Sequence, residues 1–303
     1  MSPNRPHRGA IHAESARILE HHAFPGAQYI LRVEARCCAE AARPGQFAHL
    51  DCGPALALRR PLSIFRVDPD AGWVEFLYKA VGYGTRALAR RSVGERIDLL
   101  GPIGVPFRLD TDRPRPLLIG GGVGIPPIVF VADHIRRACP EQRPLVLIGS
   151  EVPFPFSVGK AERAVPGIAT DGVMPLLEAW GIDSRLTSLQ GYAGAFQGYV
   201  TDLARRWLDA LEAPQRARVH ILACGPDPML EAVAALAHDY DLPCQVSLEE
   251  FMACAVGGCA GCTVAIQTPD GPAMKRVCVD GPVFDARQAY PRRAEKGRSR
   301  LGA

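Results

Sequence analysis

The chain has 303 residues, a formal net charge of +3 and 48% hydrophobic residues. This length predicts two or three domains, and so small a charge gives no reason to expect a nucleic-acid partner. Arg5 and Arg8 precede no apolar segment, so no signal peptide is expected. The apolar runs are too short for membrane insertion. We therefore expect a cytoplasmic protein whose ten cysteines serve metals or cores.

The first part of the chain predicts an N-terminal extension followed by a β-barrel. Residues 1–25 show weak periodicity, which is typical of a flexible segment or of a short helix at 13–21. Residues 26–110 consist of short alternating runs separated by Gly and Pro. The runs that read as strands are 29–35, 46–50, 62–67, 73–79 and 96–100. Many short strands with turns between them predict a small antiparallel barrel.

Residues 111–242 alternate between strand and helix patterns. The expected strands are 117–120, 145–149 and 219–226, and the expected helices are 128–138 and 228–238. Such alternation predicts an α/β domain with a parallel sheet covered on both faces. Residues 243–286 form a cysteine-rich lobe in this division, and 287–303 form a basic, solvated tail.

Four cysteines in the lobe have the spacing C-x4-C-x2-C-x15-C: Cys254, Cys259, Cys262 and Cys278. The residues between the first three are small, so the backbone can wrap closely around a ligand. This spacing is typical of a plant-type [2Fe–2S] cluster. Zinc is the alternative, although structural zinc usually takes two short C-x2–4-C pairs and only one exists here. A metal centre of this kind predicts one-electron transfer.

A first phosphate-binding candidate lies at the start of a barrel strand, in the run Arg59-Arg60-Pro61-Leu62-Ser63-Ile64. The guanidinium of Arg60 can hold two phosphate oxygens. Pro61 fixes the turn that delivers it, and the hydroxyl of Ser63 could bond a flavin ring nitrogen. Arg-Pro pairs also begin many ordinary strands, so the run alone is weak evidence.

A second candidate follows in the run Lys79-Ala-Val-Gly82-Tyr-Gly84-Thr85. Glycines and a threonine that open a helix offer main-chain N–H groups to phosphate. A tight turn between strand and helix explains the glycines equally well when they are considered alone.

A third candidate is the turn Gly120-Gly121-Gly122-Val123-Gly124, which follows a buried strand and precedes a helix. It departs from the full dinucleotide fingerprint, but the strand, glycine turn and helix are in the order that pyrophosphate binding requires. Glu151, after the next strand, either accepts a ribose hydroxyl of NAD or is an ordinary loop acid.

A fourth candidate is the segment Cys224-Gly225-Pro226-Asp227-Pro228-Met229, at another junction of strand and helix. Ligands of open α/β sheets bind outside the carboxyl ends of the strands. Cys224 is therefore placed to border a nicotinamide, or it is an inert buried thiol.

Taken together, the motifs between residues 27 and 284 resemble the ferredoxin–NADP reductase superfamily, and within it the electron-transfer subunits of class 1B dihydroorotate dehydrogenases. The most specific match is the C-terminal signature, which here reads Ser247-Leu-Glu-Glu, Met252-Ala-Cys254 and Cys278-Val-Asp-Gly-Pro-Val-Phe284. Phe251 and Ala255 depart from the residues that the family usually has at these positions.

The resemblance implies FAD, a [2Fe–2S] cluster and NAD. The residues implied to bind FAD are Arg60, Pro61, Leu62, Ser63, Leu77, Tyr78, Lys79, Gly84 and Thr85. Those implied to frame the NAD site are Gly121, Gly122, Gly124, Cys224 and Gly225. The four lobe cysteines hold the cluster.

The resemblance also implies an oxidoreductase subunit in pyrimidine biosynthesis. A catalytic FMN-containing dihydroorotate dehydrogenase subunit is its expected partner, in a heterotetramer of two subunits of each kind. Electrons are expected to pass from that partner through the cluster and FAD to NAD⁺. Two alternatives stay open at this point. One is a subunit of a sulfide dehydrogenase or of an NADH-dependent ferredoxin–NADP oxidoreductase, and the other is a zinc-stabilised binding module.

Overall fold

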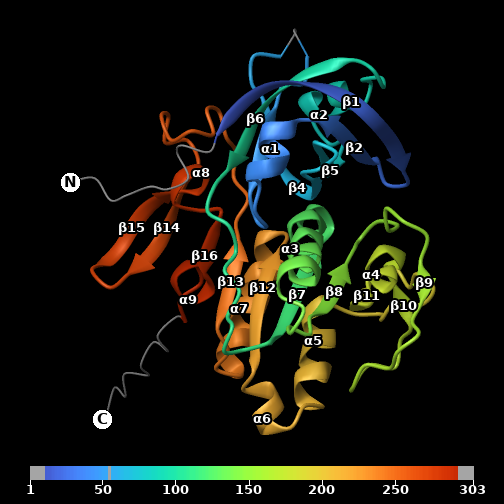
Figure 1. Cartoon of the computed structure of the whole chain (residues 1–303). Coiled ribbons are helices and arrows are strands. Elements are labelled where there is room, and N and C mark those ends of the chain that lie inside the picture. The colour runs from blue at the N-terminus through green and yellow to red at the C-terminus, as the bar shows by residue number, and fades with distance from the viewer. Residues whose placement is uncertain (1–10, 54–55, 293–303) are drawn as a thin grey trace, which may run out of the picture.

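The structure, a computed structural model, describes residues 11–53 and 56–292. A barrel, a sheet flanked by helices and a small lobe follow one another along the chain (Figure 1). The lobe lies beside both other parts, near the barrel end and the sheet edge. Residues 1–10 and most of the predicted basic tail lie outside the described residues. Within the described ranges, no helix is long and apolar enough to cross a membrane.

The predicted antiparallel barrel is confirmed. Six strands close it in the order β1-β2-β5-β4-β3-β6. They are β1 (His12–Phe24), β2 (Gln28–Glu34), β3 (Phe47–Leu50), β4 (Arg60–Asp68), β5 (Trp73–Lys79) and β6 (Arg96–Ile103). Among the described residues, two short helices join them, α1 (Arg36–Ala41) and α2 (Tyr83–Leu88). Alternate side chains, among them Leu31, Val33 and Phe76, fill the interior.

The prediction of an N-terminal extension over residues 1–25 is wrong for residues 12–24, and so is that of a helix at 13–21. These residues form β1, which pairs with β2 on one side and β6 on the other and so closes the barrel. Only Ala16 and Ile18 of this strand are fully buried. Its other positions mix His, Arg and Glu with Ala, Ser, Leu and Phe, so apolar residues do not alternate regularly along the strand.

The predicted α/β part is also confirmed, with a sheet in the order β11-β8-β7-β12-β13-β16. Its parallel strands are β7 (Arg115–Gly121), β8 (Leu145–Gly149), β11 (Asp183–Thr187), β12 (Val219–Cys224) and β13 (Cys244–Ser247). The connecting helices are η2 (Gly122–Gly124), α3 (Ile125–Ala138), α4 (Pro175–Ala179), α5 (Val200–Asp209), α6 (Ala213–Arg216) and α7 (Asp227–Asp239). A small pair, β9 (Gly159–Lys160) and β10 (Gly172–Val173), precedes α4.

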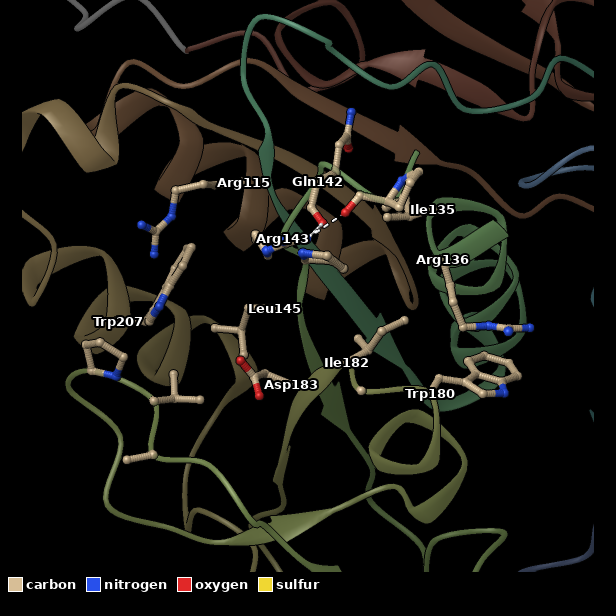
Figure 2. A pocket seen from close by; sticks show the side chains of 16 residues that line it. Arg115, Ile135, Arg136, Gln142, Arg143, Leu145, Trp180, Ile182, Asp183 and Trp207 are labelled. Carbon is tan, nitrogen blue, oxygen red and sulfur yellow. Dashed lines mark hydrogen bonds between the residues drawn. The ribbon is translucent and has the colours of Figure 1, made fainter. Parts of the chain in front are cut away.

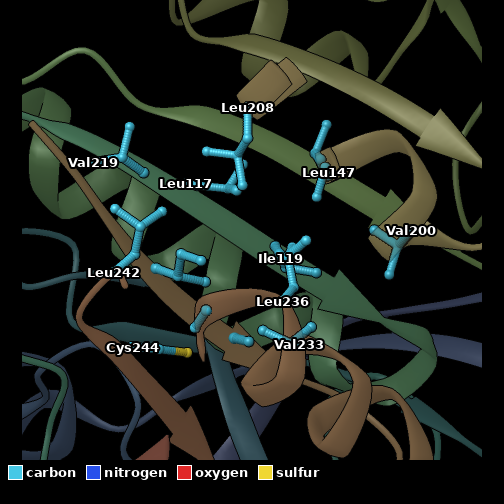
Figure 3. Packing of buried hydrophobic residues seen from close by; sticks show 14 of the residues in the cluster. Leu117, Ile119, Leu147, Val200, Leu208, Val219, Val233, Leu236, Leu242 and Cys244 are labelled. Atoms are coloured by element: carbon cyan, nitrogen blue, oxygen red, sulfur yellow. The ribbon is translucent and has the colours of Figure 1, made fainter. Parts of the chain in front are cut away.

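Each face of this sheet has its own core, because successive strand residues point to opposite faces. Leu117 and Ile119 pack with residues of α5 and α7, such as Leu208 and Val233 (Figure 3). Leu118 packs on the other face with α3. That second core also includes Phe65 and Leu77 of the barrel, so it joins the two parts.

The predicted lobe boundary at residue 243 is wrong in detail, because the sheet continues beyond it. Strand β13 extends the parallel sheet, and β16 (Val283–Asp285) adds an antiparallel edge strand. Between them lie the cysteine loop, the hairpin β14 (Thr263–Thr268) and β15 (Gly271–Arg276), and α8 (Val277–Asp280). The last helix in the described part of the chain is α9 (Ala286–Ala289), which covers the first residues of the predicted tail.

Candidate cofactor-binding site

The structure brings together the two phosphate-binding candidates of the barrel. Arg60 begins β4, and its guanidinium lies directly against Gly84 in the first turn of α2. A Cβ atom at Gly84 would lie 2.5 Å from Nε of Arg60. Nη1 of Arg60 donates to the carbonyl oxygens of Leu58 and Arg59, at 2.6 and 3.2 Å. Backbone bonds therefore hold a guanidinium beside a helix start, an arrangement that fits a pyrophosphate.

Thr85 shapes the helix start next to this guanidinium. Its Oγ1 accepts hydrogen bonds from the N–H groups of Val81 and Gly82, at 3.1 and 3.2 Å. The side chain thus caps the turn that follows Lys79, the last residue of β5. Val81 and Tyr83 are exposed beside it, which leaves room for a ligand along the turn.

The remaining residues of the predicted flavin site divide into two groups. Ser63 is half-buried on β4, opposite Phe47 of β3. Leu62, Leu77 and Tyr78 are buried. The Tyr78 hydroxyl bonds Nε2 of His21 at 2.9 Å. Leu77 and Tyr78 can therefore offer a flavin only their main chain, and their predicted role stays a prediction.

The glycine turn lies at the carboxyl end of β7, where η2 leads into α3. Gly124 packs against the main chain of β12, since a Cβ atom there would lie 2.2 Å from the carbonyl oxygen of Cys224. A Cβ atom at Gly121 would lie 2.4 Å from Sδ of Met229. Gly122 has a φ of +54° and open space around it, so it is the glycine of this turn that a ligand can approach. Strand β5 contacts the turn, which places it beside the barrel site.

The Cys224 segment lies next to that turn. Cys224 pairs in register with Gly120 on one side and Ser247 on the other. Its thiol is fully buried, which raises its pKa well above the ordinary value. Gly225 packs against Met229, a contact that the sequence did not indicate. Contact of Cys224 with a nicotinamide stays a prediction.

Glu249 is a further charged residue at this edge, which the sequence analysis treated only as part of a signature. Its charge is the second cause, after burial, of the raised pKa of Cys224. Glu249 is exposed to solvent, yet the protein packed around it raises its pKa to about 7. A carboxyl group that titrates near neutrality beside a predicted cofactor site is a candidate functional group.

The four predicted cluster ligands lie in two pairs. Sγ of Cys262 and Sγ of Cys278 are 3.4 Å apart and buried. Sγ of Cys254 accepts a bond from the N–H of Cys259 at 3.4 Å, and Sγ of Cys259 accepts one from the N–H of Gly261 at 3.4 Å. Two pairs suit two irons better than one tetrahedral zinc.

The loop that carries these cysteines turns its N–H groups toward sulfur. Ala255, Gly257 and Ala260 have φ angles of +55°, +82° and +54°. Burial raises the pKa of Cys254, but the N–H groups of Cys259, Val256 and Gly258 outweigh it and bring the pKa down to about 6. This favours the thiolate, which is the form that binds metal.

Arg276, which the sequence analysis did not single out, holds the same loop. Its Nη1 donates to the carbonyl oxygen of Gly257 at 2.7 Å. The main-chain N–H of Arg276 donates to Oδ2 of Asp280 at 2.9 Å. The arginine therefore connects the cysteine loop to the segment that carries Cys278.

Two pockets lie away from all of these segments. One of about 280 Å³ opens at the amino ends of β7, β8 and β11, between Trp180 and Trp207 (Figure 2). Nucleotides bind such sheets at the opposite edge. The other, of about 720 Å³, lies between α1 and the second half of α3. Neither is lined by a residue of the predicted sites.

Comparison with solved structures shows the fold. The chain is similar to a structure of an NADH-dependent reduced ferredoxin–NADP oxidoreductase, with a TM-score of 0.74 and 23% identity over 91% of this chain and 89% of that one. A ferredoxin–NADP⁺ reductase from Neisseria gonorrhoeae, with FAD and NADP bound, aligns with a TM-score of 0.57 and 14% identity over 76% and 92% of the two chains. The ferredoxin reductase-like architecture is thereby confirmed.

Comparison of sequences shows the family. Residues 249–289 match the iron–sulfur cluster binding domain of dihydroorotate dehydrogenase B. The electron transfer subunit of dihydroorotate dehydrogenase B (NAD(+)) from Desulforamulus reducens is 30% identical over 90% of this chain and 96% of its own length. The subunit of the same name from Shouchella clausii is 32% identical over 84% and 90%. The chain therefore belongs to the family of electron-transfer subunits of dihydroorotate dehydrogenase B.

Proposed function

We propose that the chain is the subunit that carries electrons from a dihydroorotate dehydrogenase partner to NAD⁺ in pyrimidine biosynthesis, with a [2Fe–2S] cluster and FAD between them. One observation supports this most strongly. Paired cysteines with N–H groups directed at their sulfurs lie in a lobe that packs on the barrel, and the barrel carries the Arg60–Gly84 contact. The names of the curated relatives favour this function over the sulfide dehydrogenase and ferredoxin–NADP oxidoreductase alternatives.

Residues in different parts of the chain are assigned to different cofactors. When bound, NAD exchanges hydride, the cluster exchanges single electrons and the flavin handles both. We assign the pyrophosphate of FAD to Arg60 and to N–H groups in the first turn of α2, and the flavin ring to Ser63. The turn at Gly122 faces NAD. Glu249 lies at the same carboxyl end of the sheet, and its side chain can hold a proton near neutral pH. The four cysteines hold the iron.

For the chain as a whole we propose a barrel that begins at residue 12 and an α/β part that includes β13 and β16. The lobe then comprises the segment between those two strands. We also propose a cytoplasmic location, where the lobe thiols stay reduced.

The first test is a visible absorption and EPR spectrum of the anaerobically purified protein, before and after addition of NADH. We expect a flavin spectrum that bleaches with NADH and a rhombic signal from the reduced cluster. A colourless protein that carries stoichiometric zinc would instead support the binding-module alternative.

The partner surface is proposed on the lobe. Phe251, Val256 and Met274 are large apolar side chains that are 94%, 45% and 66% exposed there. Exposed apolar side chains are often found at protein interfaces. We propose that the catalytic FMN subunit binds the lobe and that two pairs assemble into a heterotetramer.

Native mass spectrometry of the two co-expressed subunits tests this assembly. We expect two copies of each, and Phe251→Asp should weaken the contact. Val158→Asp is the matched control, since Val158 is 39% exposed and lies before β9, outside the lobe. If both substitutions weaken the assembly equally, the interface does not lie on the lobe.

A further inference from the structure

His21 is a half-buried histidine of β1, the barrel strand that the sequence did not reveal. Its Nδ1 lies 2.9 Å from the carbonyl oxygen of Arg91, and its Nε2 lies 2.9 Å from the hydroxyl oxygen of Tyr78. Since a carbonyl oxygen only accepts, Nδ1 must carry a hydrogen. In the neutral ring Nε2 then accepts the hydrogen of the Tyr78 hydroxyl. One side chain therefore joins two segments that lie 70 and 57 residues further along the chain.

The first of these segments follows α2. The N–H of Arg91 donates to the carbonyl oxygen of Leu88, the last residue of that helix, at 3.0 Å. Leu88 is fully buried and packs into the barrel core. The first turn of the same helix contains Gly84, against which the Arg60 guanidinium lies. The helix assigned to the pyrophosphate is thus fixed to the barrel at its far end by Leu88 and His21.

The second segment is the end of β5. Tyr78 is 2% exposed, so its hydroxyl is removed from water and needs a partner, which His21 provides. Burial also raises the pKa of Tyr78, so the hydroxyl keeps its hydrogen and stays a donor. Tyr78 stands between Leu77 and Lys79, and all three are implied to bind FAD. His21 therefore bonds the buried side of the strand whose main chain is assigned to the cofactor.

Aromatic packing keeps these hydrogen bonds in place. Tyr29 of β2 lies opposite Tyr78 in register, and their rings stack with 5.5 Å between centroids. The centroid of the His21 ring lies 5.5 Å from that of Tyr29 and 6.1 Å from that of Tyr78. A ring that is bonded at both nitrogens and packed against two tyrosines has little freedom to turn.

We propose that His21 is a positioning residue of the FAD site. Through its bonds to Tyr78 and Arg91 it fixes the end of α2 relative to β5, and so fixes the N–H groups of the first turn of α2 relative to the strand beside the flavin. Pyrophosphate and flavin belong to one cofactor molecule, so the two segments have to stand at the separation that this molecule requires. Both ring nitrogens of His21 are bonded, so it acts on FAD through its neighbours. This inference rests on the proposed function, which assigns FAD to the barrel.

The test compares Tyr78→Phe with Tyr240→Phe. Each substitution removes one hydroxyl and keeps the ring, and the Tyr240 hydroxyl donates to Asp209 at 2.6 Å in the α/β part. The rate at which the loaded protein releases FAD on dilution is followed by flavin fluorescence, and hydrogen exchange of residues 83–91 is measured before dilution. We expect both rates to rise about fivefold in Tyr78→Phe, as the loss of one hydrogen bond predicts. Tyr240→Phe should change neither rate.

His21→Asn breaks the same connection from its other side, because asparagine keeps a donor near the position of Nδ1 and has no group at that of Nε2. If His21 and Tyr78 act on FAD through one bond, the variant with both substitutions releases FAD no faster than the faster of the two single variants. Multiplied effects would overturn the inference. So would FAD release from Tyr78→Phe as slow as that from Tyr240→Phe, whatever the melting temperatures, because the bond would then have only a structural role.

A measurement on the unsubstituted protein covers the case in which the barrel variants do not fold. The ¹⁵N shifts of the His21 ring should show a hydrogen on Nδ1, and a hydrogen on Nε2 alone would contradict the bonds described. Failure of the proposed function would look different, because the unsubstituted protein would then bind no FAD.

Discussion

The guanidinium of Arg60 can contact residue 84 only because that residue is a glycine, with a hydrogen atom in place of a side chain. A Cβ atom at position 84 would lie 2.5 Å from Nε and 2.7 Å from Cζ of Arg60, so Gly84→Ala must push the guanidinium away. We expect the dissociation constant for FAD to rise at least about tenfold, which corresponds to about 1.4 kcal/mol. Titration of the FAD-depleted protein, followed by flavin fluorescence, measures it.

Gly82→Ala is the control for this prediction. Gly82 caps the same helix, has an extended backbone, and a Cβ atom there would meet nothing within 4 Å. Its replacement should leave FAD affinity close to that of the unsubstituted protein. If both variants bind FAD equally well, Arg60 does not hold the cofactor in the way proposed.

The raised pKa of Glu249 predicts that the stability of the fold depends on pH. The protein packed around this exposed residue raises its pKa in the folded protein from 4.5 to about 7. A carboxyl with a raised folded pKa stabilises the fold fully below about 4.5, and this stabilisation is lost as the pH rises through 7. Glu249→Gln should remove that part of the dependence. Melting temperatures between pH 4 and 8.5 measure it.

Glu250→Gln is the neighbouring control and should keep the dependence of the unsubstituted protein. Parallel pH curves for the unsubstituted protein and the Glu249 variant would show that Glu249 ionises normally and has no special place at this edge of the sheet.

At the scale of elements, strands with a clear two-residue alternation or a continuous apolar run were predictable. The strands at 73–79 and 145–149 have the predicted bounds. Strand β1 was missed because its polar residues face solvent and only Ala16 and Ile18 mark its buried side. Strands β13 and β16 were missed because sheet pairing between distant segments leaves no periodic signal in short runs.

The candidate site divides in the same way. Cysteine spacing and glycine turns are local patterns, so the sequence shows them. Glu249, Arg276 and Met229 contact neighbours that are distant in sequence, and a lone residue of each type has no local pattern. Their positions become apparent only when the fold brings β7, β12, β13 and the lobe together.

The bond from Arg276 to Gly257 joins the cysteine loop to the segment that carries Cys278, and its loss should act on that loop alone. Arg276→Ala removes a donor to the Gly257 carbonyl oxygen, so the loop should open more often and release iron faster to a chelator. Loss of visible absorbance in the presence of the chelator measures the rate. Arg287→Ala is the control, since Arg287 bonds Asp241 outside the loop. If Arg276→Ala and Arg287→Ala release iron at the same rate, the bond from Arg276 to Gly257 does not help to retain the iron.

At the scale of the molecule, the hydrophobic residues are divided among separate cores. The barrel interior and the two faces of the sheet bury large sets of aliphatic side chains. The lobe shares one small cluster, which includes two of the four predicted ligand thiols, with Phe47 and Ile103 of the barrel. The lobe has few apolar side chains of its own, so the metal must supply part of its stability.

Removal of the iron should therefore unfold the lobe and leave the rest intact. Hydrogen exchange after anaerobic chelation should rise across residues 250–280, while the barrel strands and the central strands β7, β8 and β12 stay protected. Their cores do not include the cysteine loop, and circular dichroism should keep a cooperative main transition. Removal of FAD is the comparison, since it should expose residues 60–63 and 81–88 instead. Loss of protection in β7 and β12 on chelation would show that the cluster stabilises the whole chain, against the division of the cores seen here.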